Sequence, residues 1–117
     1  MTNAGTSIEQ GSIILLPFPF TDLSSSKKRP ALVISRTEFN NKNEDIICCL
    51  ITSNPNATGV KISKKDMESG SLEFVSTIKP HRIFTASKSI IYKILGKLSI
   101  SKRRAVEKEI TNLISIL

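Results

Sequence analysis

The stretch GSIILLPFPFTDLSSSKKRPALVIS, at Gly11–Ser35, decides how this chain folds. Two apolar runs, Ile13–Leu16 and Ala31–Ile34, are separated by prolines and a serine-rich polar segment. Apolar runs bounded by Pro, Asp and Ser are typical of β-strands. The polar segment is too long for a tight hairpin turn, and loops of such length are often functional. We therefore expect two strands joined by a loop at Thr21–Lys28 that is either functional or mobile.

A basic triplet ends this loop, at the entrance to the second strand. Lys27, Lys28 and Arg29 are followed directly by Pro30. A residue before proline is restricted to extended backbone, so we expect Arg29 to have a fixed backbone direction. The alternative is a basic loop that is only solvated.

Two motifs in the opening stretch resemble the MazF/PemK family of toxin–antitoxin ribonucleases, and its PemK-like branch in particular. They are G-x-I-x-L-x-P-F-P-F-T-D-L at Gly11–Leu23 and K-R-P-A-L-V-I-S at Lys28–Ser35. The likeness extends over roughly 11–115 and is strongest at 11–35. One departure is Ser12, where the family usually has Asp or Glu. The resemblance implies a small antiparallel β-barrel of the SH3-like, CcdB/PemK type with a C-terminal helix.

The apolar pattern independently predicts a mainly β chain with some α (class α+β). Strands are expected at Ser12–Leu16, Pro30–Ser35, Ile46–Ile51, Val60–Ile62 and Ser71–Val75. Turns, loops or bulges are expected at Arg36–Asp45, Ser63–Ser69 and Ser76–Pro80. The pattern does not decide between strand and short helix at Arg82–Thr85, Ser87–Ile91 and Ser89–Lys97.

One helix is expected at the end of the chain, from Ser99 or Ser101 to about Ser115. Its inward face is predicted to carry the apolar residues that recur at helical spacing, which are Val106, Ile110, Leu113 and Leu117. The strand Ile46–Ile51 is apolar at both parities, so both of its faces should be covered, one of them by this helix.

Length and charge indicate one domain with an anionic partner. The chain has 117 residues and a net charge of +7. We expect a flexible tail at 1–10 and a single domain at 11–117. Residues 1–60 carry five cations and five anions, whereas residues 61–117 carry twelve cations and five anions. This imbalance favours nucleic acid or an acidic protein as a partner, and the alternative is a basic surface without a partner.

The N-terminal sequence and the cysteines predict a cytoplasmic protein. The opening MTNAGTSIEQ has neither a basic start nor an apolar core, so it is not typical of a signal peptide. No apolar run is long enough to span a membrane. Cys48 and Cys49 are adjacent in a predicted strand, where neighbouring side chains point to opposite faces, so we expect two reduced thiols.

The residue types exclude several kinds of active site. His81 is the single histidine, so a ribonuclease mechanism that uses two histidines is excluded. We expect His81 to be exposed on a turn. There is no HExxH, no P-loop and no dinucleotide motif, and the carboxylates are scattered. We therefore expect no metal and no cofactor. RNA cleavage is compatible with such a site because the attacking 2′-hydroxyl belongs to the substrate, and the protein need only orient it and stabilise charge.

Arg29 and Thr52 are the candidate catalytic residues. Arg29 opens the second predicted strand and Thr52 ends the third, so they would meet if these strands are antiparallel neighbours. The alternative for Thr52 is a hydroxyl that caps its own turn. The resemblance implies that this Arg and this Thr form the cleavage site, with Arg29 stabilising the phosphorane and being a candidate for shuttling a proton, and with Thr52 positioning the phosphate. It also implies cleavage of single-stranded mRNA to 2′,3′-cyclic phosphate and 5′-hydroxyl ends.

Further residues are predicted to contact RNA along the same surface. They are Lys27, Lys28, Ser53, Lys79, Arg82, Lys88 and Phe20, and possible stacking residues for single bases are Phe18, Phe20 and Tyr92. The resemblance implies an acidic antitoxin partner and a homodimer. The alternative function is a non-catalytic binding module of the same fold, a degenerate toxin or a gyrase-inhibitor-like protein.

Overall fold

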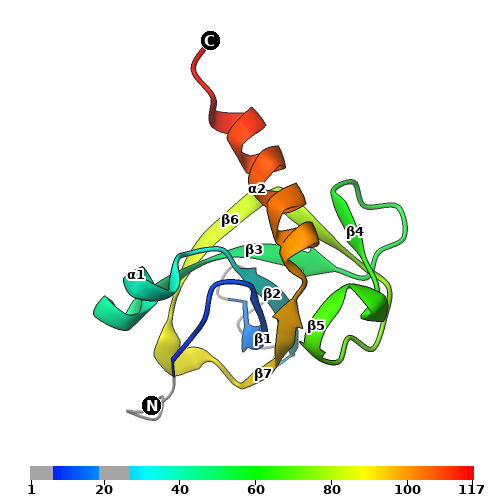
Figure 1. Cartoon of the computed structure of the whole chain (residues 1–117). Coiled ribbons are helices and arrows are strands. Elements are labelled where there is room, and N and C mark those ends of the chain that lie inside the picture. Colours follow the sequence, from blue (N-terminus) through cyan, green and yellow to red (C-terminus); the bar gives the residue numbers. More distant parts are fainter. Residues whose placement is uncertain (1–6, 19–26) are drawn as a thin grey trace.

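A computed structural model of the chain describes residues 7–18 and 27–117 (Figure 1). The strands are β1 (Ser12–Pro17), β2 (Lys28–Val33), β3 (Asp45–Thr52), β4 (Val60–Ile62), β5 (Met67–Gly70), β6 (Ser76–Ser87) and β7 (Lys93–Leu98). The helices are α1 (Thr37–Lys42) and α2 (Ile100–Ile114), with short 3₁₀ turns η1 (Lys64–Asp66) and η2 (Lys88–Ile90).

The strands described form one curled antiparallel sheet. Their order across the sheet is β4-β6-β3-β2-β1-β7-β5, and every neighbouring pair is antiparallel. The sheet curls into a half-barrel, and α2 lies across it with its C-terminal end pointing away (Figure 1). This arrangement confirms the predicted antiparallel barrel-like fold with a C-terminal helix.

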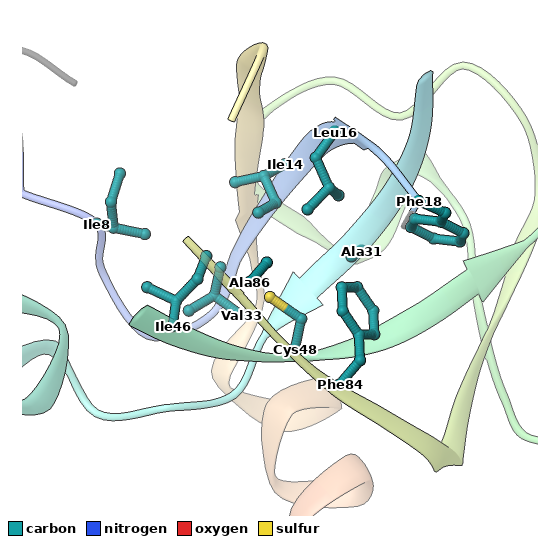
Figure 2. Packing of buried hydrophobic residues seen from close by; sticks show 10 residues of the cluster. All are labelled: Ile8, Ile14, Leu16, Phe18, Ala31, Val33, Ile46, Cys48, Phe84 and Ala86. Atoms are coloured by element: carbon teal, nitrogen blue, oxygen red, sulfur yellow. The ribbon is translucent and has the colours of Figure 1, made fainter. Parts of the chain in front are cut away.

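Two apolar clusters cover opposite faces of the central strands. Cys48 belongs to the first cluster, which is shown in Figure 2, and its neighbour Cys49 belongs to the second. The second cluster includes Val106 of α2. In the first cluster the rings of Phe18 and Phe84 meet edge to face, with centroids 5.3 Å apart. Both faces of β3 are therefore covered, as its continuous apolar sequence predicts.

The short helix α1 corrects the loop predicted at Arg36–Asp45. Its sequence TEFNNK has little intrinsic helix propensity, so packing must hold it. Asn40 is fully buried, and its side-chain NH₂ donates to the carbonyls of Ile8 at 2.8 Å and Ser35 at 3.2 Å. The Ser35 hydroxyl in turn donates to the Asn40 side-chain oxygen. These tertiary hydrogen bonds stabilise a turn of helix that local propensity does not predict.

The second half of the sheet differs from the prediction between residues 63 and 80. Ser71–Val75 is a loop rather than a strand, and the strand β5 lies just before it at Met67–Gly70. Gly70 has φ +75°, and a Cβ on it would lie 2.1 Å from the Leu95 carbonyl oxygen. The close approach of β5 to β7 thus requires glycine at this position. The charged residues before it favour a loop, so the sequence pattern does not predict this strand.

The predicted turn or bulge at Ser76–Pro80 is part of β6. The pairing of β6 with β3 passes from Cys49↔Ile83 to Ile51↔Ile78, so β6 carries extra residues between these two pairs. A bulge is therefore present, inside a strand that runs continuously from residue 76 to residue 87. A bulge of this kind increases the local twist and redirects side chains.

The terminal helix α2 has the predicted extent, but only part of its predicted face is covered. The Ser99 hydroxyl accepts the Lys102 N–H at 3.4 Å and caps the helix start. Val106 is buried, whereas Leu113 and Leu117 are exposed. The helix extends past the edge of the sheet after its first turns (Figure 1), so the apolar stripe continues beyond the surface that it packs against.

The last residues of the predicted tail belong to the folded domain. Ile8 is 2% exposed and lies in the first cluster, and the Gln10 side chain donates to the Ile34 carbonyl at 2.8 Å. Glu9 pairs with Lys97 of β7 at 2.6 Å, and this hydrogen bond and charge lower the pKa of Glu9.

Among the described residues, no helix has the length and apolar character that crossing a membrane requires.

The buried cysteines give a first prediction. Burial raises the pKa of both Cys48 and Cys49 to about 12, well above the ordinary value of a thiol. A rise of that size lowers the thiolate fraction at neutral pH by about 1,000-fold, and the thiolate is the reactive form. We expect a thiol reagent such as 5,5′-dithiobis(2-nitrobenzoate) to label neither residue in native protein and both after unfolding in guanidinium. Rapid labelling of the native protein would contradict the structure.

Candidate active site

The sheet register brings Arg29 and Thr52 to the same place. β2 and β3 are antiparallel neighbours, with Val33 opposite Cys48 and Ala31 opposite Leu50. Continuing this register by two residues sets Arg29 opposite Thr52. The two residues are therefore cross-strand neighbours at one end of the sheet, as the sequence predicts.

Both side chains project from the face of the first apolar cluster. Successive residues of a strand point to opposite faces. Ala31, two residues after Arg29, and Cys48, four residues before Thr52, both belong to the first cluster. Arg29 is exposed and Thr52 is half-buried at the rim of this cluster. The register therefore puts an arginine and a threonine on the same face of two neighbouring strand ends, at the border between apolar side chains and solvent.

Thr52 also caps the turn that follows it. Its hydroxyl oxygen accepts the N–H of Asn54 at 3.2 Å, and the side-chain oxygen of Asn54 accepts the N–H of Asn56 at 2.9 Å. Thr52 therefore caps its own turn, which is the alternative role that the sequence suggests for it. This role leaves the hydroxyl proton of Thr52 able to donate to an anion, because a hydroxyl both accepts and donates.

Several strand ends line up with this pair to form one edge of the sheet. Thr52 pairs with Thr77 of β6, and Arg29 pairs with Leu16 of β1. Leu15, next in β1, pairs with Lys93 at the start of β7. We call this row, from Thr77 to Lys93, the strand-end edge. An extended chain laid along it would cross β6, β3, β2, β1 and β7 in turn.

A pocket of about 440 Å³ adjoins the β3 side of this edge. Its lining residues are Ser53, Asn54, Pro55, Lys61, Phe74, Val75, Ser76 and Thr77. Phe74 is 65% exposed, and it is not among the residues that the sequence suggests for binding. The only sequence signal for it is an aromatic residue in a segment that resembles a strand, which favours a core role instead. Another pocket, of about 500 Å³, lies between β2 and α2, on the face of the second cluster.

Most of the other predicted RNA contacts lie near this edge. Lys27 is exposed just before β2, and Ser53 is exposed just after β3. Lys79 and Arg82 lie in the β6 bulge, Lys79 being two residues from Thr77. Phe20 lies outside the described residues.

Lys88 lies at the opposite end of β3 from Thr52, and its contact with RNA stays a prediction. It follows Ser87, which pairs with Asp45 at the start of β3, whereas Thr52 ends that strand. Seven residues of extended chain separate the two ends by about 23 Å. The Lys88 ammonium donates to the Asn40 carbonyl at 2.7 Å, so it secures α1. Sequence spacing alone cannot show at which end of β3 Lys88 lies. That position follows from the antiparallel pairing of β6 with β3, which runs from Asp45↔Ser87 to Thr52↔Thr77.

The chain's histidine and carboxylates form no compact cluster in the described part. His81 is exposed on β6. Within residues 7–18 and 27–117, no three His, Cys, Asp or Glu side chains are grouped closely enough to hold a metal ion. The polar groups that the strand-end edge offers for chemistry are therefore a guanidinium, hydroxyls and ammonium groups.

Comparison with known proteins places this chain in a family. The model of the "PemK-like, MazF-like toxin of type II toxin-antitoxin system" family matches residues 9–114. No curated protein sequence matches the chain.

Three solved structures share the fold at low sequence identity. MazF of Deinococcus radiodurans is 17% identical with a TM-score of 0.72, over 95% of this chain and 99% of that one. The Mycobacterium tuberculosis toxin MazF-mt6 is 17% identical with a TM-score of 0.70, over 91% and 98%. A mycobacterial endoribonuclease in complex with its cognate antitoxin is 13% identical with a TM-score of 0.69, over 95% and 96%. At these identities the likeness establishes the fold alone.

Proposed function

We propose that this chain, which belongs to the PemK-like, MazF-like family of toxins of type II toxin–antitoxin systems, is an endoribonuclease that cuts single-stranded mRNA without a metal ion. The observation that carries the proposal is the placement of Arg29 and Thr52 opposite each other on the strand-end edge. A second support is that proteins of the same fold are endoribonucleases. The substrate would lie along this edge and present one phosphate to the pair.

The chemistry uses the ribose as its own nucleophile. The 2′-hydroxyl gives its proton to water and attacks the adjacent phosphorus, the bond to the 5′-oxygen breaks, and that oxygen takes up a proton from water. The products are a 2′,3′-cyclic phosphate and a 5′-hydroxyl. Negative charge on the phosphorus oxygens increases in the transition state, so a fixed cation there lowers the barrier.

Arg29 and Thr52 divide this work according to their chemistry. The planar guanidinium of Arg29 can donate two parallel hydrogen bonds to phosphate oxygens. The Thr52 hydroxyl, oriented by the Asn54 N–H that it accepts, donates its proton to the same phosphate and fixes its position. Both residues extend from a rigid sheet, which keeps their geometry set before the substrate binds.

The remaining contacts hold the RNA backbone and its bases. Lys27, Lys28, Lys79 and Arg82 supply positive charge along the edge, and Ser53 and the pocket beside Thr52 receive a nucleotide. We further propose an acidic antitoxin that covers this edge, a homodimer as implied by the family, and the cytoplasm as the compartment, where the substrate is found.

Cleavage of a long single-stranded RNA in excess EDTA tests the proposal. We expect cuts at a short recurring sequence, with 5′-hydroxyl ends shown by their ready labelling with polynucleotide kinase without prior phosphatase. If folded protein makes no cuts yet binds RNA or an acidic partner, the non-catalytic binding module is the better account. If cutting requires added divalent metal, the mechanism above is wrong.

A further inference from the structure

An exposed tyrosine lies beside the entrance of β2, outside the proposed chemistry. Tyr92 is 66% exposed, between η2 and β7. Its backbone N–H donates to the Leu15 carbonyl at 2.8 Å, which fixes the chain against β1. An aromatic ring that is held at its backbone and left open to solvent is well suited to a stacking contact, because few side-chain rotations are lost on binding.

Lys28 covers part of this ring. Its ammonium nitrogen lies 5.0 Å from the ring centroid of Tyr92, a cation–π distance. Lys28 directly precedes Arg29 in β2, so the Lys28–Tyr92 contact lies at the strand end from which Arg29 also extends. A base stacked on the open part of the ring would bring its own phosphate within reach of a lysine that is already in place.

The register sets the separation between this pair and the scissile phosphate. Leu16 pairs with Arg29, and Leu15 pairs with Lys93, the residue after Tyr92. β1 alone therefore lies between Arg29 and Tyr92, which is two strand spacings or about 10 Å of backbone. A nucleotide one or two positions from the cut spans that separation.

We propose that Tyr92 and Lys28 form a stacking platform for one RNA base near the scissile phosphate. The inference rests on the proposed RNA cleavage and adds a base-contacting residue to it. Every base has a flat π face, so the platform supplies affinity and register for any base at that position rather than discrimination between bases. It lies across β1 from Arg29, on the side away from the Phe74 pocket, so the substrate would be held on both sides of the cut.

The composition makes a direct test simple, because Tyr92 is the chain's one tyrosine and there is no tryptophan. The probe is a short RNA of the mapped cleavage sequence with 2′-O-methyl riboses, which cannot be cut. We expect the tyrosine ring-proton NMR signals to shift upfield as this RNA binds, since a stacked base shields them. Binding is followed separately by fluorescence anisotropy of the labelled RNA.

Substitutions separate stacking from a merely structural role. We expect Tyr92→Ala and Tyr92→Leu to raise KM about tenfold, while Tyr92→Phe stays near wild type, because stacking needs the ring and not the hydroxyl. The value of kcat should change little in all three. Phe39→Ala is the matched control, since Phe39 is also a partly exposed aromatic but lies on α1 at the other end of β3.

An RNA series with one base removed at a time locates the partner. At one position, base removal should weaken binding to the wild type about tenfold and have no further effect on Tyr92→Ala. If RNA is cut and bound but the ring signals do not move, or if Tyr92→Leu binds like the wild type, the platform is wrong and the cleavage proposal stands. If Tyr92→Ala weakens only an acidic protein partner, the platform is likewise wrong. If no RNA binds at all, both proposals fail together.

Discussion

Replacing Arg29 with alanine is expected to lower kcat for RNA cleavage by about 100- to 1,000-fold, the usual cost of removing one preorganised donor to a charged transition state. Arg29 is exposed, so its loss should leave the fold intact, with an unchanged thermal midpoint. The variant should still bind RNA, because the neighbouring lysines remain. Single-turnover cleavage at saturating protein isolates the chemical step from binding.

Two further variants show whether geometry or charge alone matters. Arg29→Lys keeps the charge but loses the planar fork, so we expect it to recover only a small part of the rate. Arg36→Ala is the matched control, because Arg36 is an exposed arginine at the other end of the domain, ahead of α1. Equal losses in Arg29→Ala and Arg36→Ala would show a general charge effect and remove Arg29 from the active site.

Replacing Asn40 with alanine is expected to destabilise the fold by about 3 kcal/mol, the scale of losing several buried hydrogen bonds at once. The side chain is fully buried and donates to the carbonyls of Ile8 and Ser35. Its oxygen accepts the Ser35 hydroxyl proton. Alanine would remove these three hydrogen bonds and the donor that Asn40 supplies to the carbonyls of Ile8 and Ser35, whereas the Ser35 hydroxyl keeps its hydrogen bond from the Ile47 N–H. Urea unfolding with an unchanged slope measures the change as a lower midpoint.

Asn41→Ala is the control for this stability prediction. Asn41 is adjacent and exposed, and its side-chain oxygen accepts a hydrogen bond from the Ser7 hydroxyl at the surface. We expect its free energy of unfolding to stay within about 0.5 kcal/mol of wild type. Equal midpoints for the two variants would mean that α1 is held by something other than the Asn40 hydrogen bonds.

The strands that the sequence predicts correctly are those with strong apolar runs. β1, β2 and β3 each contain a continuous apolar run with Pro, Asp or Asn close to it, and such runs specify strands locally. Elements that depend on tertiary contacts cannot be predicted from the local sequence pattern. α1 rests on one buried asparagine, and β5 rests on the close approach of Gly70 to β7. The loop at Ser71–Val75 has strand-like composition but buries only Leu72.

The candidate site follows the same division. The Arg29–Thr52 pair can be predicted because it needs only two strand ends and antiparallel order. The distance of Lys88 from Thr52 cannot be predicted locally, because it depends on the register between β6 and β3. The position of Phe74 beside Ser53 and the contact of Tyr92 with Lys28 cannot be predicted in the same way. In both cases a residue that follows one element lies against the end of a strand far away in the sequence.

The most direct measurement is single-turnover cleavage, in excess EDTA, of a short RNA that contains one mapped site, with either ribose or 2′-deoxyribose before the cut. We expect the ribose form to be cut to a 2′,3′-cyclic phosphate and a 5′-hydroxyl, identified by mass spectrometry. The deoxyribose form should bind equally well and remain intact, because its nucleophile is missing. Cleavage of the deoxyribose form at a comparable rate would show that water or a protein group attacks the phosphorus, and would contradict the mechanism assigned to Arg29 and Thr52.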